Sequence, residues 1–510
     1  MRHLCCHSAS KKKQISTSKT RGIPTPSFNV EKLFSLPYHL IMDLDESLRR
    51  RLYISFITIG IFFPLVTFFF LQFFIMKSFA KANIRVDASR VITPLSYSWN
   101  ALAQGGEEIG VQMLRPVIPQ IQDLHPRYIR LDHIYDFYNV VSKDSSGSLS
   151  FNWTSLDRTV CDIYETGAKP FFSLGYMPES ISSDGTVRGE PAKWEDWSTI
   201  VKSTIERYSS SRHTVCNVPN SAQSDVYYEV WNEPDHETFG KWSISGGKDY
   251  RTLYKYSSIG ARDAQDTLPF SLGGPGTTAA YQNWIKDFLT YVDENDLRID
   301  FLSWHRYSSN ANEFGYDVKN IDGWLLDDRL NRFSNLPKIV SEWGYSGDLN
   351  PTIRNSVGAA HAVASIRSMM DKKIALAFIF EIKDGASTSH GILTNSGEKR
   401  PRYDALQMLN SLSGYRVQVT GEGDFVRAVA SRTNGEYTLM LVNYDKENKN
   451  KELVPVTFNH LVNGSYTVTI TSLGGTTVVN SEALVTNGVM KRTVFMAPNQ
   501  VTLVKLQRER

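Results

Sequence analysis

The chain has 510 residues, of which 41% are hydrophobic and 21% are charged. This length supports a large core, and the ordinary composition excludes disorder, a collagen helix or a disulfide scaffold as a description of the whole chain. The net charge of +3 is too small to indicate a nucleic-acid partner, and we expect none.

The first 80 residues predict a location rather than a catalytic domain. Residues 1–51 are polar, basic and rich in serine, so we interpret them as a disordered cytoplasmic arm. Residues 52–76 carry no charge, can span a bilayer and follow the arginines at 49–51, so the positive-inside rule places the remaining chain outside the cytoplasm. We favour this transmembrane signal-anchor segment over the alternative, a secreted protein cleaved after Ala80, which ends a small-x-small run.

A strand–helix alternation repeats eight times between residues 86 and 414. The predicted strands are Val91–Trp99, Tyr128–Asp136, Lys169–Pro178, Tyr227–Asp235, Phe270–Gly276, Phe301–Tyr307, Lys338–Tyr345 and Ala375–Asp384. Short apolar strands that do not alternate with polar residues, separated by amphipathic helices, are typical of a parallel sheet covered on both faces. Eight such units predict an α/β fold, a closed (β/α)8 TIM barrel.

The pattern changes from residue 415 onwards. The predicted strands there are Phe425–Arg432, Tyr437–Asn443, Val454–His460, Tyr466–Thr471, Lys491–Ala497 and Val501–Leu506. Tyr466, Val468 and Ile470 alternate with threonines, which is the period of a half-buried sheet. No helix-length pattern intervenes, so residues 415–510 predict a separate antiparallel β-sandwich.

Four cysteines occur, at positions 5, 6, 161 and 216. Cys161 and Cys216 could pair or could remain buried free thiols, and we favour free thiols. No cysteine–histidine spacing indicates zinc, and we expect neither a metal nor another cofactor. The oligomeric state stays open.

Ionisable residues gather where the predicted barrel strands end, which is where barrel enzymes build their active sites. Glu233 ends the fourth strand and Glu342 ends the seventh. Glycoside hydrolysis needs such a pair, because one carboxyl protonates the leaving oxygen and the other attacks the anomeric carbon or activates water. A single glutamate would more often be a surface residue, but two at these positions predict the catalytic pair.

The run Trp231-Asn232-Glu233-Pro234 resembles the signature of clan A glycoside hydrolases. With His236 and the runs at 272–276 and 301–305, the chain is most similar to family 39, which includes β-xylosidases and α-L-iduronidases and also has a terminal β-sandwich. The resemblance covers roughly residues 90–410.

The resemblance implies a role for each matching residue. Glu233 would be the general acid/base and Glu342 the nucleophile of a retaining mechanism, with carboxyl groups about 5–5.5 Å apart. Asn232 would bind the 2-hydroxyl of the sugar, and Tyr307 would donate a hydrogen bond to the nucleophile. The charge of Glu342 would also raise the pKa of Glu233.

Further residues at strand ends are expected to bind the carbohydrate: Asp132, His133, Tyr176, His305, Trp343 and Lys383. The chain departs from the family at three places. Asp132 stands where the xylosidases and iduronidases have a histidine, the eighth strand lacks the clan tryptophan, and the run at 343–345 is more similar to bacterial endo-acting relatives that degrade exopolysaccharide.

The sequence therefore predicts a retaining glycoside hydrolase that acts on an extracytoplasmic oligo- or polysaccharide. It would be either β-xylosidase/α-L-iduronidase-like or an exopolysaccharide endoglycosidase. The alternative is a membrane-anchored glycan-binding protein with an inactive barrel, which the presence of both Glu233 and Glu342 disfavours. The sugar, its anomeric configuration, exo or endo action, and transfer to a sugar instead of water all stay open.

Overall fold

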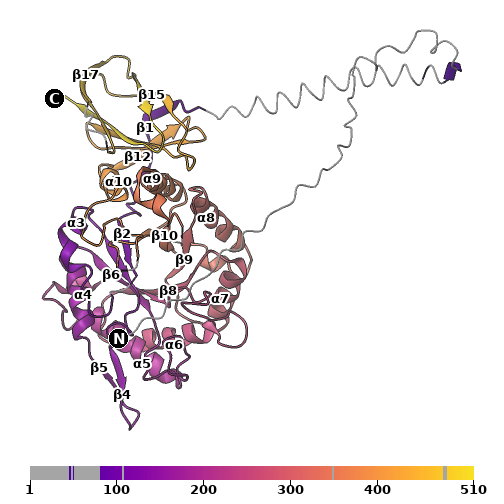
Figure 1. Cartoon of the computed structure of the whole chain (residues 1–510), viewed down its shortest axis with the longest axis vertical. Coiled ribbons are helices and arrows are strands. Elements are labelled where there is room, and N and C mark those ends of the chain that lie inside the picture. Colours follow the sequence, from indigo (N-terminus) through magenta and orange to yellow (C-terminus); the bar gives the residue numbers. More distant parts are fainter. Residues whose placement is uncertain are drawn as a thin grey trace, which may run out of the picture. The chain divides into compact units, whose positions relative to one another are not determined.

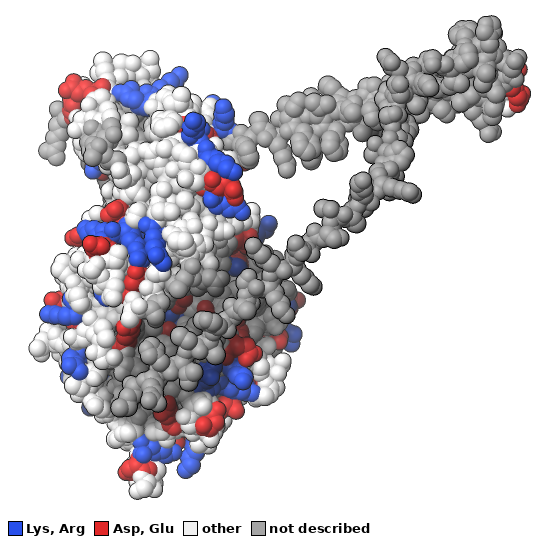
Figure 2. All heavy atoms as spheres, in the orientation of Figure 1, with Lys and Arg blue, Asp and Glu red and all other residues white. Residues whose placement is uncertain are grey.

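A computed structural model describes residues 45–47, 50, 81–105, 108–346, 350–386, 388–474 and 479–509. The predicted apolar span at 52–76, the cleavage run before Ala80 and nearly all of the basic arm at 1–51 lie outside these described residues. Within them, no helix has the length and apolar character needed to cross a bilayer. Residues 81–509 contain a barrel and a second sheet, and acidic and basic side chains are interspersed over the face in Figure 2.

The barrel of eight parallel strands is confirmed. Its strands close in the order β10-β11-β2-β3-β6-β7-β8-β9, and all neighbours are parallel. Their bounds are β2 (Ala101–Gln104), β3 (Tyr128–Leu131), β6 (Lys169–Leu174), β7 (Val226–Val230), β8 (Phe270–Thr277), β9 (Phe301–Tyr307), β10 (Lys338–Gly344) and β11 (Leu376–Phe380). Their carboxyl ends meet at one end of the barrel, which we call the mouth.

Helices surround the strands (Figure 1). They are α3 (Ile118–Gln122), α4 (Thr154–Glu165), α5 (Trp194–Tyr208), α6 (Tyr250–Asp263), α7 (Gln282–Glu294), α8 (Glu313–Trp324), α9 (Ser356–Met370) and α10 (Pro401–Leu409). Short 3-10 turns lie at η2 (Arg115–Val117), η3 (Asn220–Gln223), η4 (Asn331–Phe333) and η5 (Pro351–Arg354), and β4 (Val141–Lys143) pairs with β5 (Leu149–Phe151) in a hairpin. Asp249 and Asn355 cap α6 and α9, because each side chain accepts a hydrogen bond from a backbone N–H of the first turn.

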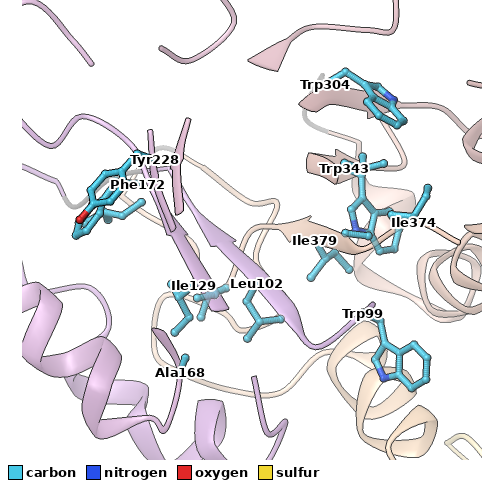
Figure 3. Packing of buried hydrophobic residues seen from close by; sticks show 14 of the residues in the cluster. Trp99, Leu102, Ile129, Ala168, Phe172, Tyr228, Trp304, Trp343, Ile374 and Ile379 are labelled. Atoms are coloured by element: carbon cyan, nitrogen blue, oxygen red, sulfur yellow. The ribbon is translucent and has the colours of Figure 1, made fainter. Parts of the chain in front are cut away.

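Side chains alternate along each barrel strand between the lumen and the helices. Phe171 belongs to the cluster that fills the lumen, whereas its neighbour Phe172 packs in the layer between strands and helices. Figure 3 shows residues of this outer layer, among them Trp304 and Trp343. This alternation decides which residues of a strand can reach the mouth.

The second sheet has nine strands in the order β17-β16-β19-β14-β13-β12-β1-β15-β18. Their bounds are β1 (Ile84–Pro94), β12 (Tyr415–Thr420), β13 (Val426–Arg432), β14 (Glu436–Asn443), β15 (Glu452–Asn459), β16 (Gly464–Ser472), β17 (Val479–Val485), β18 (Met490–Met496) and β19 (Val501–Arg508). Val468 and Val494, from opposite ends of the strand order, belong to one hydrophobic cluster, so the sheet folds over its own core as a sandwich does.

The first predicted barrel strand, Val91–Trp99, is wrong. The chain is in β1 up to Pro94, and β1 lies in the second sheet, antiparallel to β12 and parallel to β15. The physical reason is the alternation of buried Ile84, Val86 and Ala88 with exposed or partly exposed residues, which suits a sheet with one apolar face. The barrel therefore does not start at residue 86, and the sandwich is neither purely antiparallel nor restricted to 415–510.

Cys161 in α4 and Cys216, which follows α5, form a disulfide with their Cα atoms 5.2 Å apart. The free thiols that the sequence favoured are therefore wrong. The bond joins positions 55 residues apart, so it restricts the unfolded chain strongly.

Replacing both cysteines with serine should lower stability by about 4 kcal/mol, since the unfolded chain regains the entropy of that loop. The thermal unfolding midpoint of the double variant should fall relative to the unreduced wild type, and the wild type treated with reductant should fall with it. Two alkylatable thiols at these positions in unreduced, folded protein would contradict the bond.

Candidate active site

Arg130 of β3 lies at the centre of the mouth and is completely buried. Its Nε and Nη2 lie 3.0 and 2.9 Å from Oε2 of Glu229 in β7. Nη2 also donates to Oδ1 of Asn232 at 2.8 Å, and Nη1 donates to Oε2 of Glu342 in β10 at 3.2 Å. Burial opposes the charge of Arg130, but the carboxylates of Glu229 and Glu342 raise its pKa above the usual value. One cation thus fixes groups from β7, the loop after it and β10.

The fully buried Glu229 needs space that only a glycine leaves. A Cβ atom at Gly276 in β8 would lie 3.0 Å from the carboxyl carbon of Glu229, and Gly276 has a φ of +63°. The Gly276 carbonyl accepts a hydrogen bond from the Glu233 N–H at 3.0 Å. The same glycine therefore accommodates the partner of Arg130 and positions the loop that carries Glu233.

That loop has a constrained backbone. Trp231 and Glu233 both adopt left-handed conformations, with φ of 72° and 44°. Such conformations are costly for residues other than glycine and persist where packing enforces them. Trp231 is fully buried and donates from Nε1 to the Phe239 carbonyl at 3.2 Å, so packing holds the turn that presents Asn232 and Glu233.

The two predicted catalytic glutamates face each other. A carboxylate oxygen of Glu233, one of Glu342 and a ring nitrogen of His305 all lie within 4.8 Å of one another. His305 Nδ1 is 2.9 Å from Oε1 of Glu233, and the Tyr307 hydroxyl donates to Oε1 of Glu342. Both glutamates are buried, with 8% of each residue exposed.

The titration of the two carboxyl groups is coupled, because a charge on either one opposes a charge on the other. Burial raises the pKa of Glu342, against the opposing effects of His305, Arg130 and Tyr307. Burial also acts to raise the pKa of Glu233, but the hydrogen bond with His305 and its charge lower that pKa below the usual value. His305 therefore opposes the rise at Glu233 that the sequence predicted.

The remaining predicted substrate-binding residues fall into two groups. The Tyr176 hydroxyl accepts from Nδ2 of Asn232 at 3.1 Å, and the Tyr176 ring stacks on His133 with centroids 4.0 Å apart. His133 Nδ1 lies 2.8 Å from Oδ2 of Asp136. Asp132 is 4% exposed at the end of β3. The structure thus brings Tyr176, His133 and Asp132 to the mouth with Asn232, His305 and Tyr307.

Trp343 and Lys383 do not join this group. Trp343 is 1% exposed and packs against Phe314 of α8, so the prediction that it binds substrate is wrong. Since Glu342 points to the mouth, strand alternation directs its neighbour to the helices. Lys383 Nζ donates to Oδ1 of Asn395 at 2.7 Å and to the Asp384 carbonyl.

Sequence reasoning places three buried charged residues at strand ends without assigning them a role: Arg130, Glu229 and Glu381. The position of Arg130 and Glu229 at the ends of two apolar strands was a usable signal, because opposite charges at such positions can form a buried ion pair. Glu381 follows β11 and is 3% exposed. Burial, with the neighbouring charges of Asp384 and Glu342, raises the pKa of Glu381 to about 7.

The cluster of Glu233, His305 and Glu342 is also compact enough to hold a metal ion. A guanidinium nitrogen of Arg130 and the Tyr307 hydroxyl already donate to Glu342, one to each of its oxygens. That donor pattern suits a carboxylate that stays free for proton transfer or nucleophilic attack better than a metal ligand.

Comparison with known proteins agrees with this arrangement. The model of the family described as glycosyl hydrolases family 39 matches residues 83–473. A β-xylosidase of Caldicellulosiruptor saccharolyticus is 27% identical over 351 residues, which are 62% of this chain and 69% of that protein. The α-L-iduronidase of Mus musculus is 26% identical over 251 residues, which are 45% of this chain and 37% of that protein.

Solved structures share the fold. The crystal structure of the GH39 enzyme from Xanthomonas axonopodis pv. citri gives a TM-score of 0.69 at 18% identity, over 85% of this chain and 99% of that one. A monomeric β-xylosidase from Caulobacter crescentus gives 0.68 at 20% identity, over 84% and 100%.

Removing the Tyr307 hydroxyl should raise the pKa of Glu342, because the hydrogen bond stabilises the carboxylate form. A hydrogen bond to a charged group contributes about 1.5–3 kcal/mol, so the upward shift of that pKa in Tyr307→Phe should be measurable. Carbon-13 NMR of the glutamate carboxyl groups during a pH titration measures the change, with Tyr316→Phe at an exposed position as the control. An unchanged titration of Glu342 would refute this hydrogen bond.

Proposed function

The chain belongs to glycosyl hydrolases family 39, and we propose that it is a retaining enzyme that cleaves an extracytoplasmic oligo- or polysaccharide by double displacement. Its family and its β-xylosidase and iduronidase relatives make it a glycoside hydrolase. The observation that carries the retaining mechanism is the approach of Glu233 and Glu342, with one oxygen of each within 4.8 Å. Inverting enzymes keep their carboxyl groups about 6.5–9.5 Å apart to admit a water molecule.

The donors around Glu342 suit a nucleophile. Arg130 and Tyr307 each donate to one of its oxygens, so the carboxylate form is stabilised and held in one orientation. In the first step Glu342 attacks the anomeric carbon, and Glu233 protonates the departing oxygen. In the second step Glu233 takes a proton from water, which releases the sugar with retained configuration.

His305 suits the change of protonation that Glu233 undergoes. When Glu233 is protonated, its hydroxyl can donate to Nδ1 of a neutral His305; when it is ionised, Nδ1–H can donate to the carboxylate. The separation of 2.9 Å between Nδ1 of His305 and Oε1 of Glu233 suits a hydrogen bond in either direction. In the free enzyme His305 holds the pKa of Glu233 below its usual value, against the opposing charge of Glu342, and the formation of the covalent intermediate removes that opposing charge.

Asn232 is placed to bind the 2-hydroxyl of the sugar, because Arg130 and Tyr176 fix both ends of its amide. The substrate is either of the β-xylosidase/α-L-iduronidase kind or an exopolysaccharide cleaved internally. The curated relatives named here support the first alternative. The run at 343–345 no longer supports the second, since Trp343 is buried away from the mouth.

The extracytoplasmic location is supported by the Cys161–Cys216 disulfide, because such bonds persist in oxidising compartments. The uncharged segment at 52–76 supports the same location as an anchor, or as a signal with cleavage after Ala80. The carbohydrate would then be a surface or extracellular glycan.

Azide should distinguish the roles of the two glutamates. Glu233→Ala should still form the glycosyl-enzyme from an activated aryl glycoside, and azide should restore turnover and give a glycosyl azide of retained configuration. Glu342→Ala should lose activity on the order of 10⁴-fold, and azide should give the inverted product. Product configuration is read by NMR, with Glu294→Ala as the exposed control. Inversion in rescued Glu233→Ala, or near-normal rates in Glu342→Ala, would show the assignment to be wrong.

The location is tested by protease accessibility. Protease added to intact cells that express the full chain should remove the domain formed by residues 81–509, detected with an antibody against the sandwich. A cytoplasmic marker protein serves as the control for membrane integrity. Complete protection of the domain, together with its degradation after membrane permeabilisation, would contradict the proposed topology.

A further inference from the structure

Two buried acidic side chains at the mouth have no role in the displacement. Glu381 follows β11, which lies four strands from β7 in the barrel order and therefore opposite Glu233. Asp132 follows β3, which lies opposite β9 and His305. A sugar held between Glu233 and Glu342 would therefore have acidic side chains on the other side of the mouth.

Glu381 is fixed close to the nucleophile. Its Oε1 accepts a hydrogen bond from the Thr388 hydroxyl at 2.8 Å, and its charge acts on both Glu342 and Tyr307. β11 is paired with β10, the strand that carries Glu342. The carboxyl group of Glu381 thus has a defined orientation in the wall of the sugar site.

Asp132 retains an acceptor that the protein does not use. Its Oδ1 is buried and has no hydrogen-bond partner among the described residues. A buried carboxylate oxygen without a donor is unfavourable, and a hydroxyl group of a bound sugar would supply one. The position of Asp132 beside the buried Arg130 keeps it at the end of β3.

The neighbouring basic side chains already have acceptors. Arg130 is bound by Glu229, Glu342 and Asn232, as described above. Arg400 contacts both carboxylate oxygens of Asp384, Arg402 donates to the His390 carbonyl, and Lys383 donates to Asn395. Each of these cations already donates to a protein acceptor, and Nε of Arg402, which has no partner among the described residues, is buried and not exposed to bind the carboxylate of an acidic sugar.

We propose that Glu381 and Asp132 make the sugar-binding subsite selective for a neutral glycosyl unit, so that the enzyme accepts sugars with hydroxyl donors and rejects uronic acids. This proposal rests on the proposed function. Carboxylates accept hydrogen bonds from hydroxyl groups, and they repel a carboxylate that no cation compensates. Of the two kinds of relative, the chain then resembles the β-xylosidases, and not the iduronidases, in the charge of its substrate.

The test compares substrates that differ only in the acid group. Exo action is measured with aryl glycosides of both anomers: xylosides, glucosides, glucuronides and iduronides. Endo action is measured with a uronic-acid polysaccharide and with its carboxyl-reduced form. At pH 8, where Glu381 with its pKa of about 7 is mostly ionised, wild-type kcat/KM should favour the neutral member by about 100-fold or more. A preference for the acidic member would overturn the proposal.

Glu381→Gln keeps the size and one oxygen acceptor of the side chain and removes its charge. It should raise the ratio of kcat/KM on the acidic substrate to kcat/KM on the neutral substrate by about tenfold. Glu398→Gln, an exposed change in the same loop region, should alter neither value. An unchanged ratio in folded Glu381→Gln would overturn the role of Glu381, and Asp132→Asn provides the same measurement if the first variant does not fold.

Binding separates this proposal from the proposed function. If no substrate is cleaved by folded wild-type protein, the hydrolytic function is contradicted. Calorimetric titration with the neutral and acidic members of the same pair, as methyl glycosides or oligosaccharides, then still measures selectivity. Equal or tighter binding of the acidic member would refute the proposal without any reference to turnover.

Discussion

The buried guanidinium of Arg130 is the interaction on which the site depends. A cation at zero exposure is tolerated only where its charge and its N–H groups are compensated, and Glu229, Glu342 and Asn232 do so together. Because these partners belong to β7, the loop after it and β10, one residue of β3 sets the spacing of groups that are far apart in the sequence. The same contact stabilises the charge of Glu342 and directs the amide of Asn232.

The electrostatic arrangement of the mouth follows from that fixed cation. Arg130 compensates part of the negative charge, and His305 and Tyr307 add one contact each to the two glutamates. The charge of the buried Arg402 also acts on Glu381, but burial outweighs that effect and raises the pKa of Glu381 to about 7. The mouth is thus acidic on the side opposite Glu233, although the protein as a whole carries a small positive charge.

The sequence was sufficient for the barrel, the sandwich core and the position of Glu233 and Glu342 at the mouth, because strand ends and the Asn-Glu-Pro motif are local features. It was insufficient where the structure of a segment depends on residues that are distant in the sequence and close in space. The apolar residues of β1 are equally compatible with a barrel or a sandwich until β12 and β15 are known. Trp343 was wrongly predicted to bind substrate, because the prediction used its residue type and not the alternation of side chains along β10, in which Glu342 points to the mouth and its neighbour points away. Cys161 and Cys216 could not be paired, since nothing local shows that α4 and the segment after α5 meet.

The position of β1 has a consequence for how the protein is synthesised. Ribosomes release this strand first, but its partners β12 and β15 follow only after the whole barrel has been made. Roughly 320 residues separate β1 from β12. At a translation rate of about 5–20 residues per second, β1 therefore stays unpaired for roughly 15–60 s. Its apolar face is open to other chains during that time, and the exposed Arg85 and Arg90 would reduce such pairing. The pairing of β1 with β12 and β15, which joins the beginning of the domain to its end, therefore forms late. A nascent chain stopped before β12 would carry an unpaired strand to which chaperones can bind.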